Sequence, residues 1–177
     1  MAHNGFFGLK SKLIFKSFLI FSFILISSSL SAQSPTNFSG KWAFDKSRSN
    51  PGQGGLFLDG DRILEITQNS TSIIFAETLI REGGEDIKNV DTFNFDGKEK
   101  IVKGDFGTTK NTLKWSEGKK ILTVTTIMTT VSKGISDDYL VADSYKLSND
   151  GRTLTIESYS KNQATGERTI TMVYNKK

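Results

Sequence analysis

The feature that most restricts the fold of this chain is an alternation of apolar and polar residues with a period of two. It recurs in about ten segments between turn sequences, and no helical apolar period of useful length interrupts it. The turns include "REGGED", "FDGK", "SEGK" and "SNDGR", whose glycines supply the positive φ that tight hairpins need. The pattern predicts an all-β domain. The expected strands cover residues 40–46, 62–68, 72–81, 87–95, 98–103, 109–116, 120–132, 139–147, 153–161 and 167–175.

The short connections between these segments predict how the strands pair. They leave little room for crossover helices, so successive strands should run antiparallel in an up-and-down order. We expect about 8–10 strands to close into a barrel, because closure removes exposed sheet edges. The segment 121–131, "ILTVTTIMTTV", is uncharged and β-prone, and as a free edge it would promote aggregation. We therefore expect it to be a central strand, paired on both sides.

The first 32 residues differ from the rest of the chain. Three lysines precede the apolar run "FLIFSFILI", and the small-residue stretch "SSSLSA" follows it. The run is well short of the roughly 20 residues that a membrane-spanning helix needs. This pattern is typical of a secretory signal peptide, and we expect cleavage after Ala32. Residues 33–177 would then form a single domain, secreted or periplasmic, with no cysteine to carry a lipid anchor.

The composition of residues 33–177 excludes several functions. The leader would remove three of the 23 basic residues, and the 20 that remain are interspersed with 19 acidic residues, which argues against nucleic-acid binding. The chain has no cysteine, and its only histidine, His3, lies in the leader. Catalytic Ser-His-Asp and Cys-His arrangements and His-based zinc sites are therefore excluded. We expect no enzyme, no cofactor and no metal, since the acidic turns "DGD" and "SDD" lack the ligand spacing of a calcium loop.

Gly40 and Trp42 open the first expected strand with the motif Gly-x-Trp. This opening of an all-β chain resembles the lipocalins and avidins, the calycin group of closed barrels. The run "FSGKW…DKS", followed by the hairpins "DGK" and "DGRTLTI", resembles small secreted lipocalin-like proteins of bacteria, many without an assigned activity. The resemblance implies a structural role for Trp42, packed across the closed end of the barrel, although the indole could instead form a wall of a binding site. It also implies a basic side chain over the indole, for which the candidates are Arg168, Lys176 and Lys177.

Two groups of residues are candidates for a ligand site. The glycine-rich loop 47–61 carries Leu56, Phe57 and Leu58, which could either close over the barrel mouth or simply cover the core. The second group consists of polar residues in phase with inward apolar ones, which either point into the lumen or sit in water at a rim. The residues that we expect to line the lumen are Glu77, Trp115, Asp143, Tyr145 and Arg168. A resemblance to intracellular fatty-acid binders implies that an inward Arg168 pairs with a ligand carboxylate, and a pair with Glu77 or Asp143 is the alternative.

Three functions fit these observations. The first is a secreted or periplasmic lipocalin-like barrel that binds a small, largely apolar molecule in its lumen. The second is a ligandless barrel that serves as an interaction or scaffold module in the envelope, for which an exposed apolar patch on the outer face would be the sign. The third is an outer-membrane barrel, but the strands lack the lipid-facing apolar residues and aromatic girdles that such proteins need.

Overall fold

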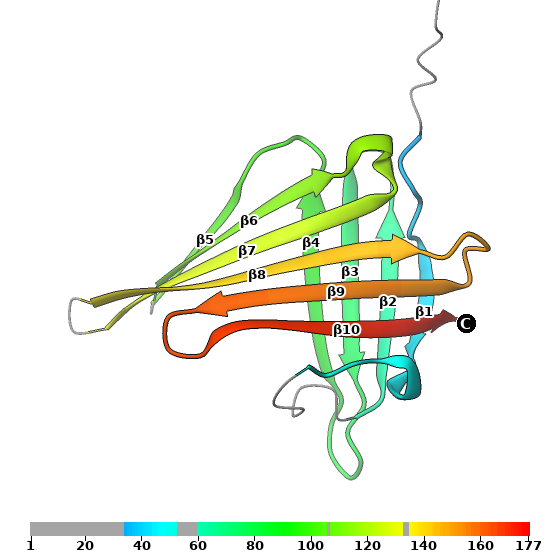
Figure 1. Ribbon diagram of the computed structural model, residues 1–177, viewed down its shortest axis with the longest axis horizontal. Coiled ribbons are helices and arrows are strands. Elements are labelled where there is room, and N and C mark those ends of the chain that lie inside the picture. Colours follow the sequence, from blue (N-terminus) through cyan, green and yellow to red (C-terminus); the bar gives the residue numbers. More distant parts are fainter. Residues whose placement is uncertain (1–33, 53–59, 106, 133–134) are drawn as a thin grey trace, which may run out of the picture. The chain divides into compact units, whose positions relative to one another are not determined.

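The computed structural model describes residues 34–52, 60–105, 107–132 and 135–177, which belong to one compact unit. They form a single ten-stranded antiparallel sheet with two short 3-10 helices, η1 (Lys46–Arg48) and η3 (Glu117–Lys119) (Figure 1). The all-β prediction is confirmed. The expected signal peptide and the three loop residues Leu56, Phe57 and Leu58 lie outside the described residues. The strands are β1 (Gly40–Phe44), β2 (Arg62–Gln68), β3 (Ser72–Leu79), β4 (Ile87–Asn94), β5 (Lys100–Gly104), β6 (Gly107–Trp115), β7 (Ile121–Ser132), β8 (Ile135–Leu147), β9 (Thr153–Asn162) and β10 (Gly166–Lys176).

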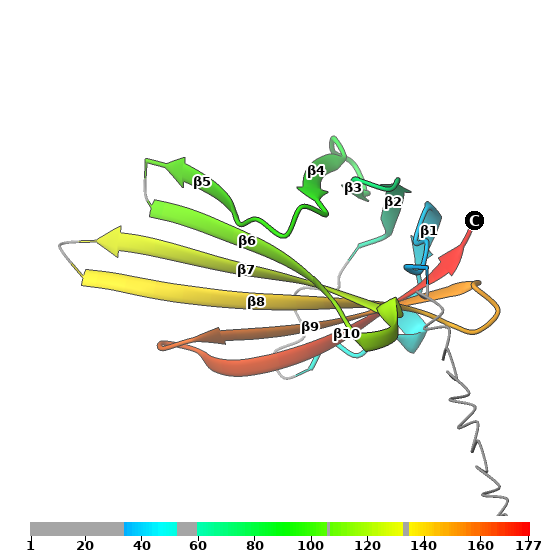
Figure 2. The same ribbon diagram turned by 90° about the horizontal axis from the view of Figure 1, so that it is seen from above.

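The strands form an up-and-down meander with one gap in its wall. Their hydrogen-bonded order is β4-β3-β2-β1-β10-β9-β8-β7-β6-β5, so the first and last strands meet where β1 pairs with β10. In that register Trp42 faces Lys176 and Phe44 faces Tyr174. β4 and β5 are consecutive along the chain but stand at opposite ends of this order, and Figure 2 shows β5 following β6 away from β4. The result is the predicted lipocalin-like barrel, nearly closed.

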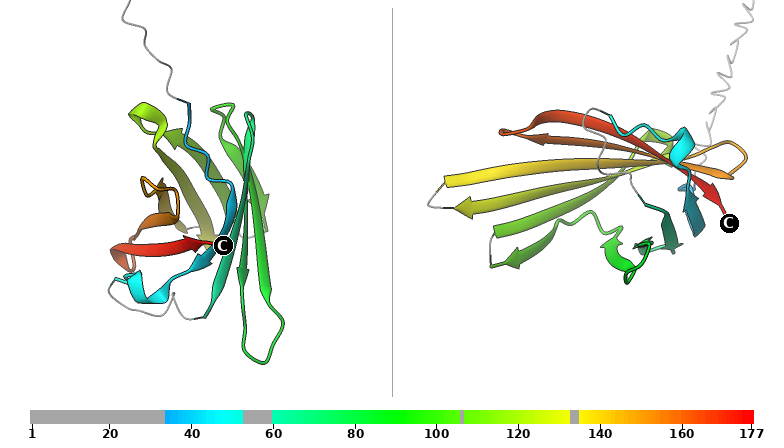
Figure 3. Two further views of the ribbon diagram at one scale, coloured as in Figure 1. Left: turned by 90° about the vertical axis from the view of Figure 1, so that its right-hand side faces the viewer. Right: turned by 90° about the horizontal axis from the view of Figure 1, so that it is seen from below.

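The barrel wall consists of two crossing layers. In Figure 1 the strands β2, β3 and β4 run up the page, whereas β8, β9 and β10 run across it. Figure 3 shows from the side that these green and orange-to-red strands face each other. A closed sheet needs such tilt and twist along its strands. Side chains of one alternation phase therefore point into the space between the layers.

β7 and β8 form the longest hairpin of the barrel. β7 pairs with β6 on one side and β8 on the other, as its uncharged sequence predicts. The turn expected over 132–138 is shorter than predicted, because β8 already begins at Ile135. Asp138 lies opposite Thr129, whose hydroxyl donates to the carboxylate at 2.7 Å. This cross-strand hydrogen bond offsets the poor β propensity of aspartate and extends the strand.

The apolar core occupies one end of the barrel. Its buried residues come from the beginnings of the odd strands β3, β7 and β9 and from the ends of the even strands β2, β4 and β10, which meet at one end of an antiparallel meander. Segment 34–39 crosses this end. Gln68 holds the segment by accepting from the Phe38 N–H at 3.0 Å and donating to the Thr36 carbonyl at 3.0 Å. Phe38 is fully buried and stacks on Trp115 with ring centroids 5.9 Å apart. The chain thus closes its own barrel at this end.

Trp42 lies at the centre of the closed end, with no exposed surface. Its indole N–H donates to the Phe38 carbonyl at 3.1 Å, and the Lys176 ammonium lies 5.4 Å from the ring centroid. Gly40 has a φ of 149°, and a Cβ there would lie 3.3 Å from the Lys176 side chain. Of the three basic candidates for the cover, Lys176 therefore occupies the position, and Gly40 leaves room for it. Arg168 instead donates to the Pro51 carbonyl at 2.7 Å.

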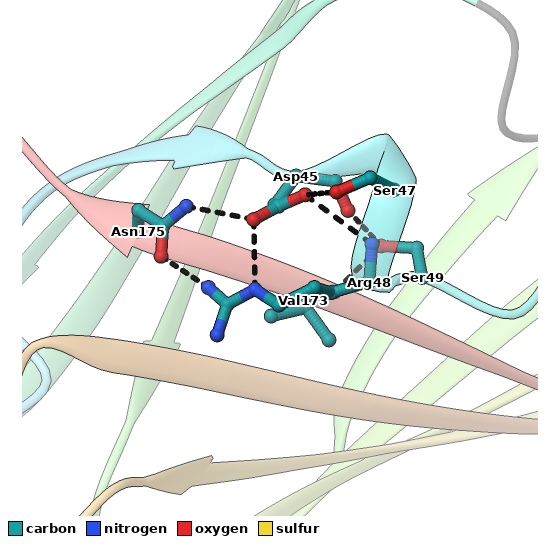
Figure 4. A network of polar contacts seen from close by, with 6 residues as sticks. All are labelled: Asp45, Ser47, Arg48, Ser49, Val173 and Asn175. Atoms are coloured by element: carbon teal, nitrogen blue, oxygen red, sulfur yellow. Dashed lines mark hydrogen bonds and ion pairs between the residues drawn. The ribbon is translucent and has the colours of Figure 1, made fainter.

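A polar network fastens η1 to β10 (Figure 4). Asp45 caps η1 by accepting from the Arg48 backbone N–H at 3.2 Å, and its carboxylate also binds the Ser47 hydroxyl and the Arg48 guanidinium. The amide nitrogen of Asn175 on β10 donates to the same carboxylate at 2.9 Å. The Ser47 and Arg48 hydrogen bonds hold the pKa of Asp45 well below its usual range. The turn that leaves β1 is therefore fixed to the last strand.

Candidate functional site

Beyond the apolar end, the barrel interior is hollow. A cavity of about 390 Å³ lies between β3 and β4 on one side and β5 to β8 on the other. A second cavity of about 220 Å³ continues toward β2, β9 and β10. The two are neighbouring parts of one lumen, and the larger falls within the roughly 300–1,000 Å³ typical of small-molecule sites. The residues that line both cavities are Phe75, Asp91, Asp143 and Tyr145.

The sheet register places these four side chains on the inner face. Phe75 lies opposite Asp91 across the β3–β4 ladder, and the core residue Val124 lies opposite Asp143 across the β7–β8 ladder. Directly opposite residues share one face of a sheet, so each carboxylate shares the face of a buried apolar side chain. On these two ladders, the inner face thus places a carboxylate directly beside a buried apolar side chain.

An aromatic wall of Phe75, Phe93 and Tyr145 separates the apolar end from the lumen. Phe75 stacks on Tyr145 with ring centroids 4.7 Å apart and meets Phe93 edge-on at 6.0 Å. Among the described residues, none forms a hydrogen bond with the Tyr145 hydroxyl, which belongs to a side chain that lines both cavities. Burial, followed by the charge of Asp143, raises the pKa of Tyr145 well above its usual range. The hydroxyl is therefore a neutral group available to a molecule in the lumen.

Arg62, Glu77 and Tyr174 form a second polar group in the smaller cavity. The Arg62 guanidinium lies 3.3 Å from the Glu77 carboxylate, and the two side chains are 18% and 32% exposed. Burial raises the pKa of the Tyr174 phenol, and the negative charge of Glu77 raises it further. Glu77 is thus partnered by a cation within the protein.

Asp143 is the most deeply placed carboxylate of the lumen. Burial raises its pKa, a hydrogen bond from Ser158 opposes this shift, and the charge of Glu77 adds to it. No basic side chain among residues 34–52, 60–105, 107–132 and 135–177 forms an ion pair with Asp143 or with Asp91. The lumen therefore holds two carboxylates that form no ion pair with Lys100 or Arg62, the basic side chains that share its cavities.

Lys100 connects the two sides of the gap between β4 and β5. Its ammonium donates to the Thr92 carbonyl on β4 at 3.1 Å and lies 5.3 Å from the centroid of the Phe93 ring. Lys100 itself belongs to β5 and lines the larger cavity. The Lys100 side chain thus spans the gap between β4 and β5, where no backbone hydrogen bonds join the two strands.

The structure places the predicted lining residues at three depths along the barrel. Glu77, Asp143 and Tyr145 line the lumen. Trp115 packs in the apolar end and lines neither cavity. Arg168 shares the inner face of β10 with Met172 and Tyr174, but its contact with Pro51 holds it beyond the two cavities. The expected pair of Arg168 with Glu77 is replaced by the pair of Arg62 with Glu77.

Several lining residues were missed by the sequence analysis although their signal was present. Asp91 alternates with Phe93, and Asn111 alternates with Leu113 and Trp115, so both have the phase of the apolar core. The same test that selected Glu77 would have selected them. Lys100 has no such signal, because β5 is short and exposed along its whole length.

No protein-family model and no curated protein sequence matches this chain. Among solved structures, the zebrafish ileal bile acid-binding protein complexed with cholic acid is similar over 79% of this chain and 98% of that chain, with 16% identity and a TM-score of 0.48. The lipocalin-like fold of this protein rests on its own strand order, its closure through β1 and β10, and Trp42 at its closed end.

Within the described part of the chain, no group of three or more His, Cys, Asp and Glu side chains is placed to hold a metal ion. The described helices include none with the length and hydrophobicity needed to cross a membrane.

Proposed function

We propose that this protein is a secreted lipocalin-like barrel that binds a small, partly apolar molecule in its lumen and catalyses no reaction. The observation that carries the proposal is the contrast along the barrel axis. Phe38, Trp42 and Trp115 fill one end, yet cavities of about 390 and 220 Å³ remain beyond the aromatic wall. A space of this size, lined by both apolar and polar side chains, is typical of a small-molecule site.

The lining supports a ligand of mixed character. Phe75, Phe93 and Met172 offer apolar surface for the body of the molecule. Asp143 and Asn111 offer hydrogen-bonding groups on the facing strands. Sites for small molecules typically combine an apolar lining with a few convergent polar groups of this kind.

A non-catalytic role is supported by the residues available. Residues 33–177 contain neither histidine nor cysteine, the usual general base and soft nucleophile. Glu77 is engaged by Arg62, so it is held as part of an ion pair. The lining can bind a small molecule with the side chains it has, whereas catalysis would require a further general base or nucleophile.

A matched pair of variants tests lumen binding with the neutral dye Nile red. Thr109→Phe places a phenyl ring in the larger cavity, whereas Thr108→Phe makes the same change at the neighbouring position on the outer face of β6. We expect the first variant to lose most of the dye fluorescence and the second to retain it. Equal dye binding by both variants would contradict the proposal. If only Thr109→Phe loses dye binding, native mass spectrometry of protein from its own host would identify the bound molecule by its added mass.

Secretion is supported by the leader pattern at residues 1–32. The test is N-terminal sequencing of the protein recovered from the periplasm and from the medium of its host. We expect the mature chain to begin at Gln33 or within one or two residues of it. Recovery of the full-length chain in the cytoplasm alone would overturn this part of the proposal.

A ligandless interaction module is the second candidate, and one observation favours it. Val90 on β4 and Ile101 on β5 are 65% and 52% exposed, and these strands border the gap in the barrel wall. Val90→Thr and Ile101→Thr would weaken binding to a protein partner without altering Nile red binding. Loss of dye binding with partner binding intact would favour the lumen instead.

A further inference from the structure

We infer that the lumen takes a ligand with a cationic head, a protonated amine on an apolar body, and that Asp91 and Asp143 hold the ammonium group. The inference rests on the proposed function, because it specifies which class of molecule the same lumen binds. Three observations carry it: the balance of charges around the cavities, the unpaired Tyr145 hydroxyl, and the aromatic faces beside the carboxylates.

The charges around the lumen come from five strands. The acidic groups are Glu77 on β3, Asp91 on β4 and Asp143 on β8. The basic groups are Arg62 on β2 and Lys100 on β5. The two phenols, Tyr145 and Tyr174, are kept neutral because burial raises the pKa of each.

The two basic groups already have partners. Arg62 pairs with Glu77 at 3.3 Å. The Lys100 ammonium donates to the Thr92 carbonyl and lies over the Phe93 ring, at the gap and facing β4. Within the described part of the chain neither cation forms an ion pair with Asp91 or Asp143, and three carboxylates against two cations leave the lumen with a net negative charge. A cation in the shared part of the lumen would neutralise both.

Tyr145 provides an independent indication of a ligand. Its ring is held by stacking on Phe75, and its hydroxyl has no hydrogen-bond partner among the described residues. Tyr145 is half-buried and lines both cavities, so a molecule in the lumen can reach its hydroxyl. The phenol oxygen can accept a hydrogen bond from an ammonium group. It shares both cavities with Asp91 and Asp143, so the three groups face one common space.

The aromatic wall favours the same class of ligand. Ring faces attract cations within about 6 Å, as the Lys100 ammonium at 5.3 Å from Phe93 already shows in this structure. Phe75 and Tyr145 border the position between the two carboxylates. An anionic head group there would be repelled by Asp91 and Asp143 and would gain nothing from the ring faces. The lumen is thus suited to an amine and unsuited to a carboxylic acid.

Three probes with one apolar body and different head groups test the inference: phenylpropylamine, phenylpropanol and phenylpropionate. Isothermal titration calorimetry at neutral pH and low salt compares their affinities. We expect the amine to bind at least about tenfold tighter than the alcohol, the scale of one or two charge-assisted hydrogen bonds, and the carboxylate to bind weakest. Equal affinities, or the carboxylate binding tightest, would overturn the inference while leaving lumen binding in place.

Charge-removing variants locate the head group. Asp143→Asn and Asp91→Asn should each weaken amine binding at least about fivefold and leave phenylpropanol binding unchanged. Glu157→Gln, on the outer face of β9, is the matched control and should change neither. Asp91→Asn, at a more exposed position, tests the head-group contact independently of any effect of Asp143→Asn on folding. Amine affinity unaffected by both lumen variants would overturn the inference, and failure of all three probes and of Nile red to bind would overturn the proposed function with it.

Discussion

The two ends of the barrel interior use the same alternating sequence pattern for opposite purposes. At the closed end the inward positions hold Trp42, Leu122 and Leu154, which have no exposed surface. Further along β7, and on the neighbouring strand β8, the inward positions hold Thr126 and Asp143, and the interior is open. Backbone and register are continuous between the two regions. Only the chemistry of the inward side chains changes.

This difference teaches where stability and binding reside in a small barrel. The closed end supplies most of the buried apolar area, which is the main favourable contribution to folding. Because that end secures the fold, the lumen can keep empty volume and poorly solvated charges that would be too costly in a core. The two regions should therefore respond to substitution in different ways.

The largest effect is expected at Trp42. Trp42→Ala removes the central residue of the closed end and should lower the free energy of unfolding by about 3–5 kcal/mol, measured by urea denaturation. Val90→Ala, at an exposed position on β4, should change it by less than about 0.5 kcal/mol. A loss at Trp42 no larger than at Val90 would break the distinction between the two regions.

An intermediate effect is expected in the polar part of the lumen. Glu77→Ala removes a partly buried ion pair with Arg62 and should cost about 1–2 kcal/mol of unfolding free energy. Its control is Glu65→Ala, which removes an ion pair with Lys41. The two charged groups of that pair are only 2.6 Å apart, but both side chains are more than half exposed. We expect little change there, because water and salt screen exposed pairs. A larger loss at Glu65 would contradict the role of burial.

Asp143→Asn should act in the opposite direction and stabilise the unliganded protein by about 1 kcal/mol at neutral pH. Burial raises the pKa of Asp143, so its contribution to stability is present below its unfolded pKa, near 3.8, and is lost as pH rises through the folded value. The gap between variant and wild type should therefore open as pH rises and vanish near pH 3. Urea denaturation across this range measures it. A gap that widens on acidification would contradict the assigned direction.

The smallest effect is expected at Lys176. Lys176→Met keeps an apolar stem over the indole but removes the ammonium, at a cost of about 0.5–1 kcal/mol. Lys177→Met is the control, because no ring contact is formed by that side chain in the described structure. The loss at Lys176 should be insensitive to Nile red or amine binding, since it lies at the closed end. An equal loss of unfolding free energy in both variants would show that the cation–π contact does not stabilise the protein.

The strands of this barrel could be predicted closely from the sequence, because alternation and turn chemistry are local properties. Gly40 and Trp42 at the start of the first strand also indicated the closed end. The gap between β4 and β5 could not be predicted, since both segments alternate like their neighbours and only the three-dimensional register separates them. Phe38 was missed because it lies before the first strand, where no alternation marks its direction.

The candidate site was partly predictable for a related physical reason. Alternation tells which face of the sheet a residue occupies, but not how far along the barrel axis it lies. Glu77 and Asp143 have the inward phase and reach the lumen. Trp115 and Arg168 also have the inward phase, yet they lie on opposite sides of the lumen along the axis. The position of a residue along the barrel axis depends on how far neighbouring strands are shifted relative to one another. The sequence of a single strand does not contain this information.

The pairing of β1 with β10 has a consequence for how this domain folds. Asp45 and Asn175 are 130 positions apart, and Trp42 receives its cover from Lys176 on the last strand. Contacts that are distant in sequence form slowly, since the intervening chain must first be ordered. The order in which the strands pair should therefore run from the local hairpins to the ring, with the β1–β10 ladder among the last parts to form.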